Sequence, residues 1–125
     1  MFYTLSQVAI GGAIGASLRY LSNVSAMRLF GPGFPYATLF VNVLGSFVMG
    51  LLVVTLALKG GTRFAPFLMT GILGGFTTFS AFSLDSFTLW ERGEIVTALA
   101  YIAASIILSL AALAAGIYLA RGALA

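Results

Sequence analysis

The chain has 125 residues, of which 61% are hydrophobic and 7% charged, and this composition excludes a soluble domain with a polar exterior. We therefore expect the chain to lie in a lipid bilayer. The net charge of +3 comes from six scattered basic residues against three acidic ones, so we expect no nucleic acid as partner. Cys and His are both absent, which excludes disulfides, thiol chemistry and imidazole metal sites, and with them most enzyme classes.

Apolar runs predict an all-α membrane protein with four transmembrane helices, forming a single domain over residues 1–125. Crossing about 30 Å of hydrocarbon takes about 20 helical residues. The first run lacks the positive flank and the small-residue cleavage site of a signal peptide, so we expect it to be retained as a helix. The predicted spans cover about residues 2–21, 36–58, 64–90 and 95–120.

The first span carries a face of small residues, Gly11, Gly12, Gly15 and Ala16, which lets helix backbones approach closely. Arg19 follows on the same helix, and a cation is costly at membrane depth unless it snorkels or finds a partner. Two interpretations of Arg19 stay open. It is either an anchor at the interface or an electropositive entrance for an anion.

In the second span, Thr38, Asn42 and Ser46 are spaced i, i+4 and i+8, so they form a polar stripe on one helix face. Such a stripe can bond a neighbouring helix. Its other interpretation is an ion pathway. Asn42 is the stronger candidate for a pathway, because its amide offers two donors without the desolvation cost of a cation.

The third span contains the run Gly74–Ser83, in which two glycines and two threonines predict a helix break near residues 74–78. A break at membrane depth persists only where protein or an ion pathway surrounds the freed backbone groups. The sequence therefore indicates permeation rather than a plain lipid anchor.

Three phenylalanines of this run recur every three residues, which predicts that Phe76, Phe79 and Phe82 lie along one side of the resumed helix. Core packing is the ordinary interpretation of such spacing. The functional alternative is that the positive ring edges attract an anion, with Ser80 and Ser83 supplying hydroxyl donors beside the rings.

The fourth span repeats the polar spacing more faintly with Ser105 and Ser109, which are i, i+4. A serine in a membrane helix can bond its own backbone, so this signal is weak alone.

Orientation is the next property that the sequence addresses, because Lys and Arg counts in short flanking loops set it. Here the counts tie at three, which predicts insertion in both orientations and an antiparallel dimer with its twofold axis in the membrane plane. The alternative is that a buried arginine or the amino-terminal charge breaks the tie. The tie compares Lys59, Arg63 and Arg121 with Arg19, Arg28 and Arg92.

These residues together resemble the Fluc fluoride-channel family, also called CrcB, over essentially the whole chain. The resemblance rests on Gly11-Gly12 to Arg19-Tyr20, on Thr38–Asn42 with Gly45, and above all on Gly74–Ser83. It implies a dual-topology antiparallel homodimer with two fluoride pores. It also implies a multi-pass protein of the bacterial inner membrane.

The resemblance further implies which residues meet the ion. Two phenylalanines face permeating fluoride, one asparagine lies in the pore, hydroxyls lie near that site, and serines form a polar track on the fourth helix. The matching residues are Phe79 and Phe82, Asn42, Ser80 and Ser83, and Ser105 and Ser109.

A structural Na⁺ between the subunits is also implied, bound by the main-chain carbonyls of Gly74 and Thr77. Helix unwinding frees carbonyl oxygens, which suit a hard monovalent cation. Ala81 departs from the family, since many members have threonine there.

We therefore expect a channel, not an enzyme, that passes fluoride down its electrochemical gradient and protects against fluoride toxicity. A small dual-topology multidrug antiporter is one alternative, but it needs a buried carboxylate, for which Asp85 is a poorly placed candidate better explained as solvated or interfacial. A non-conducting membrane scaffold subunit is the other alternative.

Overall fold

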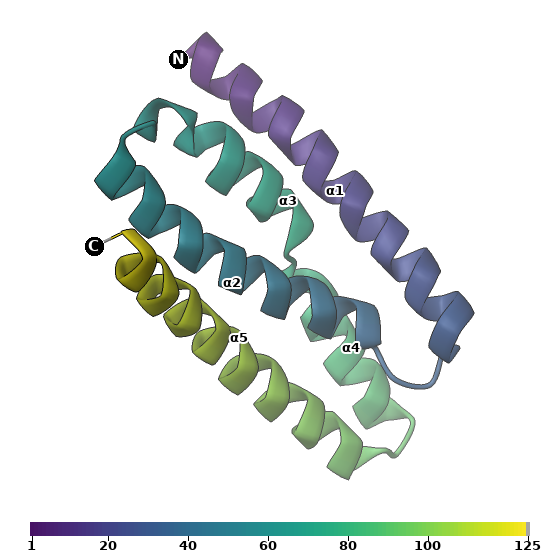
Figure 1. Ribbon diagram of the computed structural model, residues 1–125. Coiled ribbons are helices and arrows are strands. Elements are labelled where there is room, and N and C mark those ends of the chain that lie inside the picture. The colour runs from purple at the N-terminus through teal and green to yellow at the C-terminus, as the bar shows by residue number, and fades with distance from the viewer. Residues whose placement is uncertain (125) are drawn as a thin grey trace.

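The computed structural model describes residues 1–124, and over that range the chain forms helices and turns with no strand. This confirms the prediction of an all-α protein. Figure 1 shows both termini and the turn after α2 at one end of the bundle, with the other turns at the opposite end. In chain order the helices are α1 (Phe2–Phe30), α2 (Tyr36–Lys59), η1 (Thr62–Phe64), η2 (Pro66–Leu73), α3 (Gly74–Phe76), α4 (Phe79–Glu91) and α5 (Ile95–Leu124).

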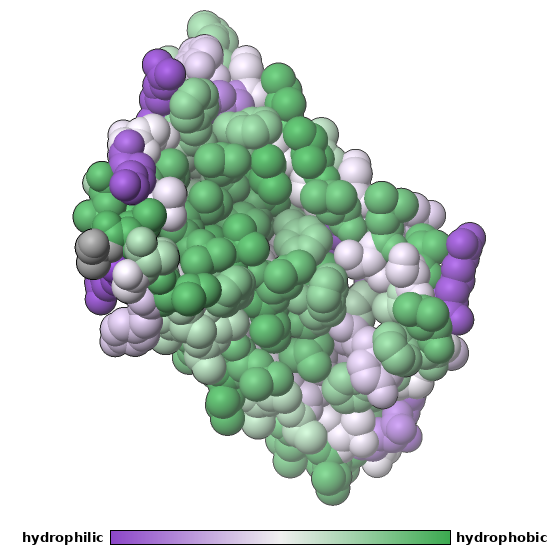
Figure 2. All heavy atoms as spheres, in the orientation of Figure 1, coloured by the Kyte–Doolittle hydropathy of each residue, from purple (hydrophilic) through white to green (hydrophobic). Residues whose placement is uncertain are grey.

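Three helical stretches are long and apolar enough to cross a membrane. They are Tyr36–Lys59, Thr62–Glu91 and Ile95–Leu124, with mean hydropathies of 2.3, 1.4 and 2.3. Helix α1 has 29 residues and is long enough, but polar residues such as Gln7 and Arg19 make it less apolar than the other three. Figure 2 shows hydrophobic residues across the middle of the visible face and strongly hydrophilic ones toward its ends. Membrane insertion of the first predicted span stays a prediction.

Helix α1 is longer than the predicted span of residues 2–21 and continues to Phe30. Residues 22–30 contain no Gly or Pro, and the helix ends at Gly31, whose φ of +75° glycine adopts without steric cost. The following Pro32 cannot continue a helix. The hydrophobic run thus marked only the most apolar part of a longer helix.

The third span changes neighbours along its length. Its first half, the π-helix η2 with α3, packs against α1, whereas its second half, α4, packs against α5. Helix α2 packs chiefly against α5. Figure 1 shows this crossing, with α3 beside α1 and α4 passing behind α2 toward α5. The interruption of the third span lies where it crosses α2.

Helices α2 and α5 approach closely at a pair of glycines. A Cβ added to Gly50 would overlap the Leu113 carbonyl oxygen, and one added to Gly116 would overlap the Phe47 carbonyl oxygen. In membranes, small residues at a crossing allow this kind of backbone contact. The α2–α5 pair is therefore closely packed at this crossing.

We expect Gly116→Ala to destabilise the protein by about 1–3 kcal/mol, the usual range for overpacking. The added methyl group meets backbone of α2, which cannot move aside as a flexible side chain could. The measurement is the unfolding midpoint in detergent. Gly122→Ala on the same helix is the control, because its Cβ would have no neighbour within 4 Å. Equal midpoints for the two variants would contradict the close crossing.

Candidate functional site

The third span is interrupted at Thr77 and Thr78, whose backbones are extended rather than helical. Their φ and ψ angles are −86° and 156° for Thr77, and −153° and 123° for Thr78. Thr77 Oγ1 donates to the Leu73 carbonyl over 2.8 Å, and Thr78 Oγ1 accepts from the Ala81 N–H over 3.2 Å. The interruption falls within residues 74–78 but is narrower, because the two glycines stay helical in α3.

Asn42 of α2 bonds both polar groups of the Thr78 backbone. The Thr78 N–H donates to Asn42 Oδ1 over 2.7 Å, and Asn42 Nδ2 donates to the Thr78 carbonyl over 3.0 Å. In a continuous helix the Thr78 N–H would instead bond the Gly74 carbonyl four residues earlier. The Asn42 amide therefore replaces helical bonds at the break. Its Nδ2 carries a second N–H beyond the one donated here.

Arg19 reaches the same break from α1. Its Nε donates to the Gly75 carbonyl over 3.0 Å, and that carbonyl would accept from the Phe79 N–H in a continuous helix. The half-buried side chain thus turns toward the break, where the Gly75 carbonyl is its partner. A hydrogen bond to a carbonyl offsets part of the cost of placing a cation at this depth. Its role as an entrance for anions stays a prediction.

Two carbonyls at the break, those of Gly74 and Thr77, lose their helical donors. The Thr78 N–H goes to Asn42, and the Ala81 N–H goes to Thr78 Oγ1. Among residues 1–124 no group of three or more His, Cys, Asp and Glu could hold a metal ion, so a metal bound here would need neutral oxygens. Free carbonyl oxygens are ligands that a hard cation accepts. The residues present therefore fit the predicted Na⁺.

A hollow of about 450 Å³, which we call the polar groove, opens between α2, α4 and α5 beside the break. None of the described residues that line it is charged. It brings together five of the residues predicted to form a pore, although they come from three helices. These are Asn42, Phe79, Phe82, Ser105 and Ser109.

Two features of the polar groove suit an anion. The rings of Phe79 and Phe82 are 5.4 Å apart between centroids and tilted by 52°, and Phe79 is 77% exposed. Ser105 Oγ is buried and has no hydrogen-bond partner among residues 1–124. A buried hydroxyl without a partner costs free energy, and an anion that accepts a hydrogen bond from it would remove that cost.

The remaining predicted residues lie elsewhere. Phe76 is buried on the other side of α2, so the prediction that three phenylalanines share one side is wrong. The extended break between Phe76 and Phe79 ends the helical spacing on which that prediction depended. Ser80 and Ser83 do not line the polar groove: Ser83 Oγ donates to the Phe79 carbonyl over 3.0 Å, and Ser80 Oγ lies 3.2 Å from Thr78 Oγ1.

Sequence reasoning missed Tyr101, which is fully buried beside the polar groove and whose ring centroid lies 5.4 Å from that of Phe82. A signal for it was present, because Tyr101, Ser105 and Ser109 are spaced i, i+4 and i+8. Asp85 is half-buried, and its Oδ2 accepts from the Tyr101 hydroxyl over 3.3 Å; its interfacial position stays a prediction.

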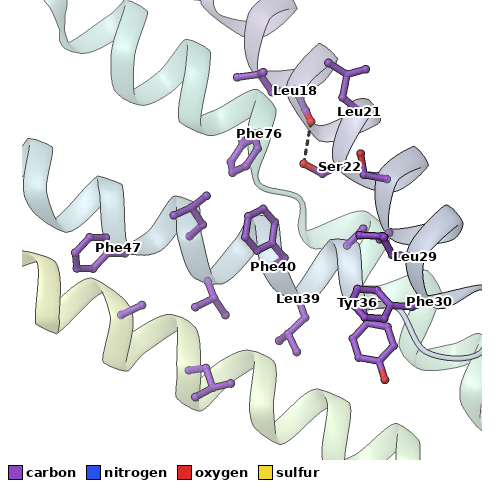
Figure 3. Close-up of a pocket in the computed structure, with 17 residues that line it drawn as sticks. Leu18, Leu21, Ser22, Leu29, Phe30, Tyr36, Leu39, Phe40, Phe47 and Phe76 are labelled. Carbon is purple, nitrogen blue, oxygen red and sulfur yellow. Dashed lines mark hydrogen bonds between the residues drawn. The ribbon is translucent and has the colours of Figure 1, made fainter.

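A second, larger hollow of about 1100 Å³ lies between α1 and α2, and we call it the apolar groove. Figure 3 shows Leu18 and Leu21 of α1 on one side of it and Phe40 of α2 on the other, with Phe76 at its inner end. It contains no charged side chain among the described residues that line it. The apolar groove is therefore an unfilled surface made almost entirely of apolar side chains.

Comparison with known proteins supplies the family. Residues 6–117 match the family described as CrcB-like protein, Camphor Resistance (CrcB). A protein of Cereibacter sphaeroides is 66% identical over 106 residues, which are 85% of each chain, and one of Paracoccus denitrificans is 59% identical over 106 residues, also 85% of each. A protein of Mesorhizobium japonicum is 51% identical over 105 residues, which are 83% of this chain and 85% of the relative.

These three relatives are each named fluoride-specific ion channel FluC. The family match covers the helices that build the break and the polar groove. The chain described here belongs to the CrcB family.

Proposed function

We propose that this protein is a fluoride channel that exports the ion passively across the bacterial inner membrane, as a multi-pass protein and not as an enzyme. The observation that carries the proposal is the polar groove beside the break. It combines uncharged donors with the exposed ring of Phe79 and the buried hydroxyl of Ser105. Relatives with up to 66% identity are named fluoride-specific ion channels.

The chemistry of the polar groove fits a small anion that must bind weakly enough to leave. Phenyl rings present a positive edge, and the Asn42 amide and the Ser105 hydroxyl can donate to fluoride without any fixed positive charge. A lysine or arginine in the groove would hold an anion in place. Its absence from the described lining favours permeation over tight binding.

The driving force is the membrane potential. Hydrogen fluoride enters cells as a neutral weak acid and ionises at cytoplasmic pH, so fluoride accumulates inside. An interior-negative potential contributes about 2.3 kcal/mol per charge per 100 mV toward moving an anion out. A passive channel therefore suffices for protection against fluoride toxicity.

We also propose that two chains form an antiparallel homodimer by inserting in opposite orientations. The sequence counts three basic residues on each side, which supports dual insertion. Arg19 turns into the bundle, so the turns and termini themselves hold three basic residues at one end and two at the other, a difference of one that favours a single orientation. The apolar groove in Figure 3 offers a surface that a second copy can fill.

The carbonyl oxygens of Gly74 and Thr77 would hold a structural Na⁺ between the two copies. Two oxygens from each chain would make four neutral ligands, and Gly74 is exposed on the surface of the single chain. The cation would neutralise freed backbone oxygens and fix the two breaks to one another. It is a structural ion and is not transported.

A liposome efflux assay tests the proposed function against its alternatives. We expect purified protein to release fluoride from loaded vesicles, with chloride released far more slowly and a lipophilic cation not exchanged for protons. Release of fluoride is read with an ion-selective electrode. Proton-coupled exchange of the cation would instead identify an antiporter, and no flux of any ion would identify a scaffold.

A further inference from the structure

Tyr101 lies between two hollows. One is the polar groove, and the other is a hollow of about 210 Å³, which we call the end pocket, lined by Thr38, Asp85, Arg92 and the turn at residues 31–35. The Tyr101 side chain is fully buried and lines neither hollow, but its ring contacts a wall of each. The ring centroids of Tyr101 and Phe82 are 5.4 Å apart, and those of Tyr101 and Phe34 are 5.5 Å apart with the rings edge to face.

The Tyr101 hydroxyl is held on the side of the end pocket. It donates to Asp85 Oδ2 over 3.3 Å, and among residues 1–124 this is the one hydrogen bond of the Asp85 carboxylate. Arg92 lines the same pocket but donates Nη1 to the Gly33 carbonyl over 3.4 Å, so it does not pair with Asp85. The carboxylate therefore has no competing partner for its bond to Tyr101.

Ser105 lies one turn along α5 from Tyr101, and the bond to Asp85 makes the Tyr101 O–H unavailable as a donor to an anion near Ser105. Its buried hydroxyl has no partner and lines the polar groove. An anion bound there would gain from a second donor nearby. The proton of Tyr101 is directed to Asp85, so the anion would meet the lone pairs of the tyrosine oxygen instead.

We propose that Asp85 is a positioning residue that keeps the Tyr101 hydroxyl turned toward the end pocket, and thereby slows the passage of an anion between the polar groove and the end pocket. This inference rests on the proposed function, in which the polar groove carries fluoride. Asp85 acts through Tyr101 and does not itself bind the ion. Removing the carboxylate frees a donor for fluoride and speeds its passage.

A double-mutant cycle on the full-length protein in fluoride-loaded liposomes tests this. With Tyr101 present, Asp85→Ala should raise the fluoride efflux rate about fivefold, a modest effect for a bond to a charged group because 3.3 Å is long for such a bond. In the Tyr101→Phe background the same change removes only the negative charge, which itself repels an anion, so we expect a rise that is clearly smaller than with Tyr101 present. Asp85→Asn keeps the side-chain size and a weaker acceptor, so we expect an intermediate increase.

Glu91→Gln is the matched control, because it removes one negative charge from the same end of the bundle at an exposed position without touching Tyr101. We expect its rate to stay within about 1.5-fold of the wild-type rate. Equal effects of Asp85→Ala in both backgrounds would show that Asp85 acts by its charge alone, which overturns the inference. A wild-type protein that releases no fluoride would overturn the proposed function itself and this inference with it.

Discussion

Replacing either Phe79 or Phe82 by isoleucine should reduce fluoride efflux from proteoliposomes to the level of protein-free vesicles. Both rings line the polar groove, and Phe79 is largely exposed there. Isoleucine keeps an apolar side chain but has no positive ring edge to attract the anion. Because the groove holds no charged residue among those described, it has no other strong attraction with which to compensate. Efflux is measured with a fluoride electrode.

Phe87→Ile is the control for this prediction. Phe87 lies on α4 with Phe79 and Phe82, is 60% exposed and lines neither the polar groove nor the end pocket. We expect it to conduct as the wild type does. Size-exclusion chromatography should show the same assembly for all three variants. A loss of fluoride flux is then caused by a change in the pore and not by a loss of assembly. Wild-type flux in both groove variants would remove the ring-edge mechanism.

The helices and much of the polar groove could be predicted from sequence because both depend on regular spacing. The i, i+4 spacing of Ser105 and Ser109 placed them on one face of α5, and that face lines the polar groove. Asn42 and Ser46 line it from α2 for the same reason. Within one uninterrupted helix, spacing along the chain determines which side chains lie together.

Spacing fails across the break, where the backbone direction changes. Phe76 and Phe79 are three residues apart, but the extended Thr77 and Thr78 separate them and leave Phe76 against α1 and α2. Sequence periodicity cannot give the dihedral angles of an irregular segment. A different limit applies to Ser83: it lies within α4, and spacing did not show that its hydroxyl bonds the Phe79 carbonyl of the same helix rather than lining the polar groove.

Bonds between helices were the other feature that the sequence could not supply. Asn42 was predicted either to bond a neighbouring helix or to donate to an ion, but not which residue it would bond, and most of its amide is engaged with Thr78 of the third span. Arg19 was expected at an interface or at the entrance for an anion, and its Nε donates to the Gly75 carbonyl. Both contacts join residues more than 30 positions apart, and they depend on how α1, α2 and the third span pack.

Asn42→Leu should abolish fluoride efflux and also lower the stability of the protein. The substitution leaves the N–H and the carbonyl of Thr78 without partners, and each unsatisfied buried group costs about 1–3 kcal/mol. The extended geometry of the break then loses its support from α2, which displaces the phenyl rings that follow it. Efflux and the unfolding midpoint in detergent are both measured. Thr55→Val serves as the control on the same helix, because Thr55 bonds only its own helix at Leu51.

A second substitution separates the two roles of Asn42, support of the break and donation to the anion. Asn42→Asp keeps an oxygen that accepts from the Thr78 N–H, but it removes the amide donor and places a negative charge in the polar groove. We therefore expect a midpoint nearer to that of the wild type than Asn42→Leu shows, with no fluoride efflux, because the charge repels the anion. Efflux from Asn42→Asp at the wild-type rate would mean that fluoride does not pass this residue. An unchanged midpoint in Asn42→Leu would mean that the break is held by other contacts, of which the Arg19 bond to Gly75 is the nearest.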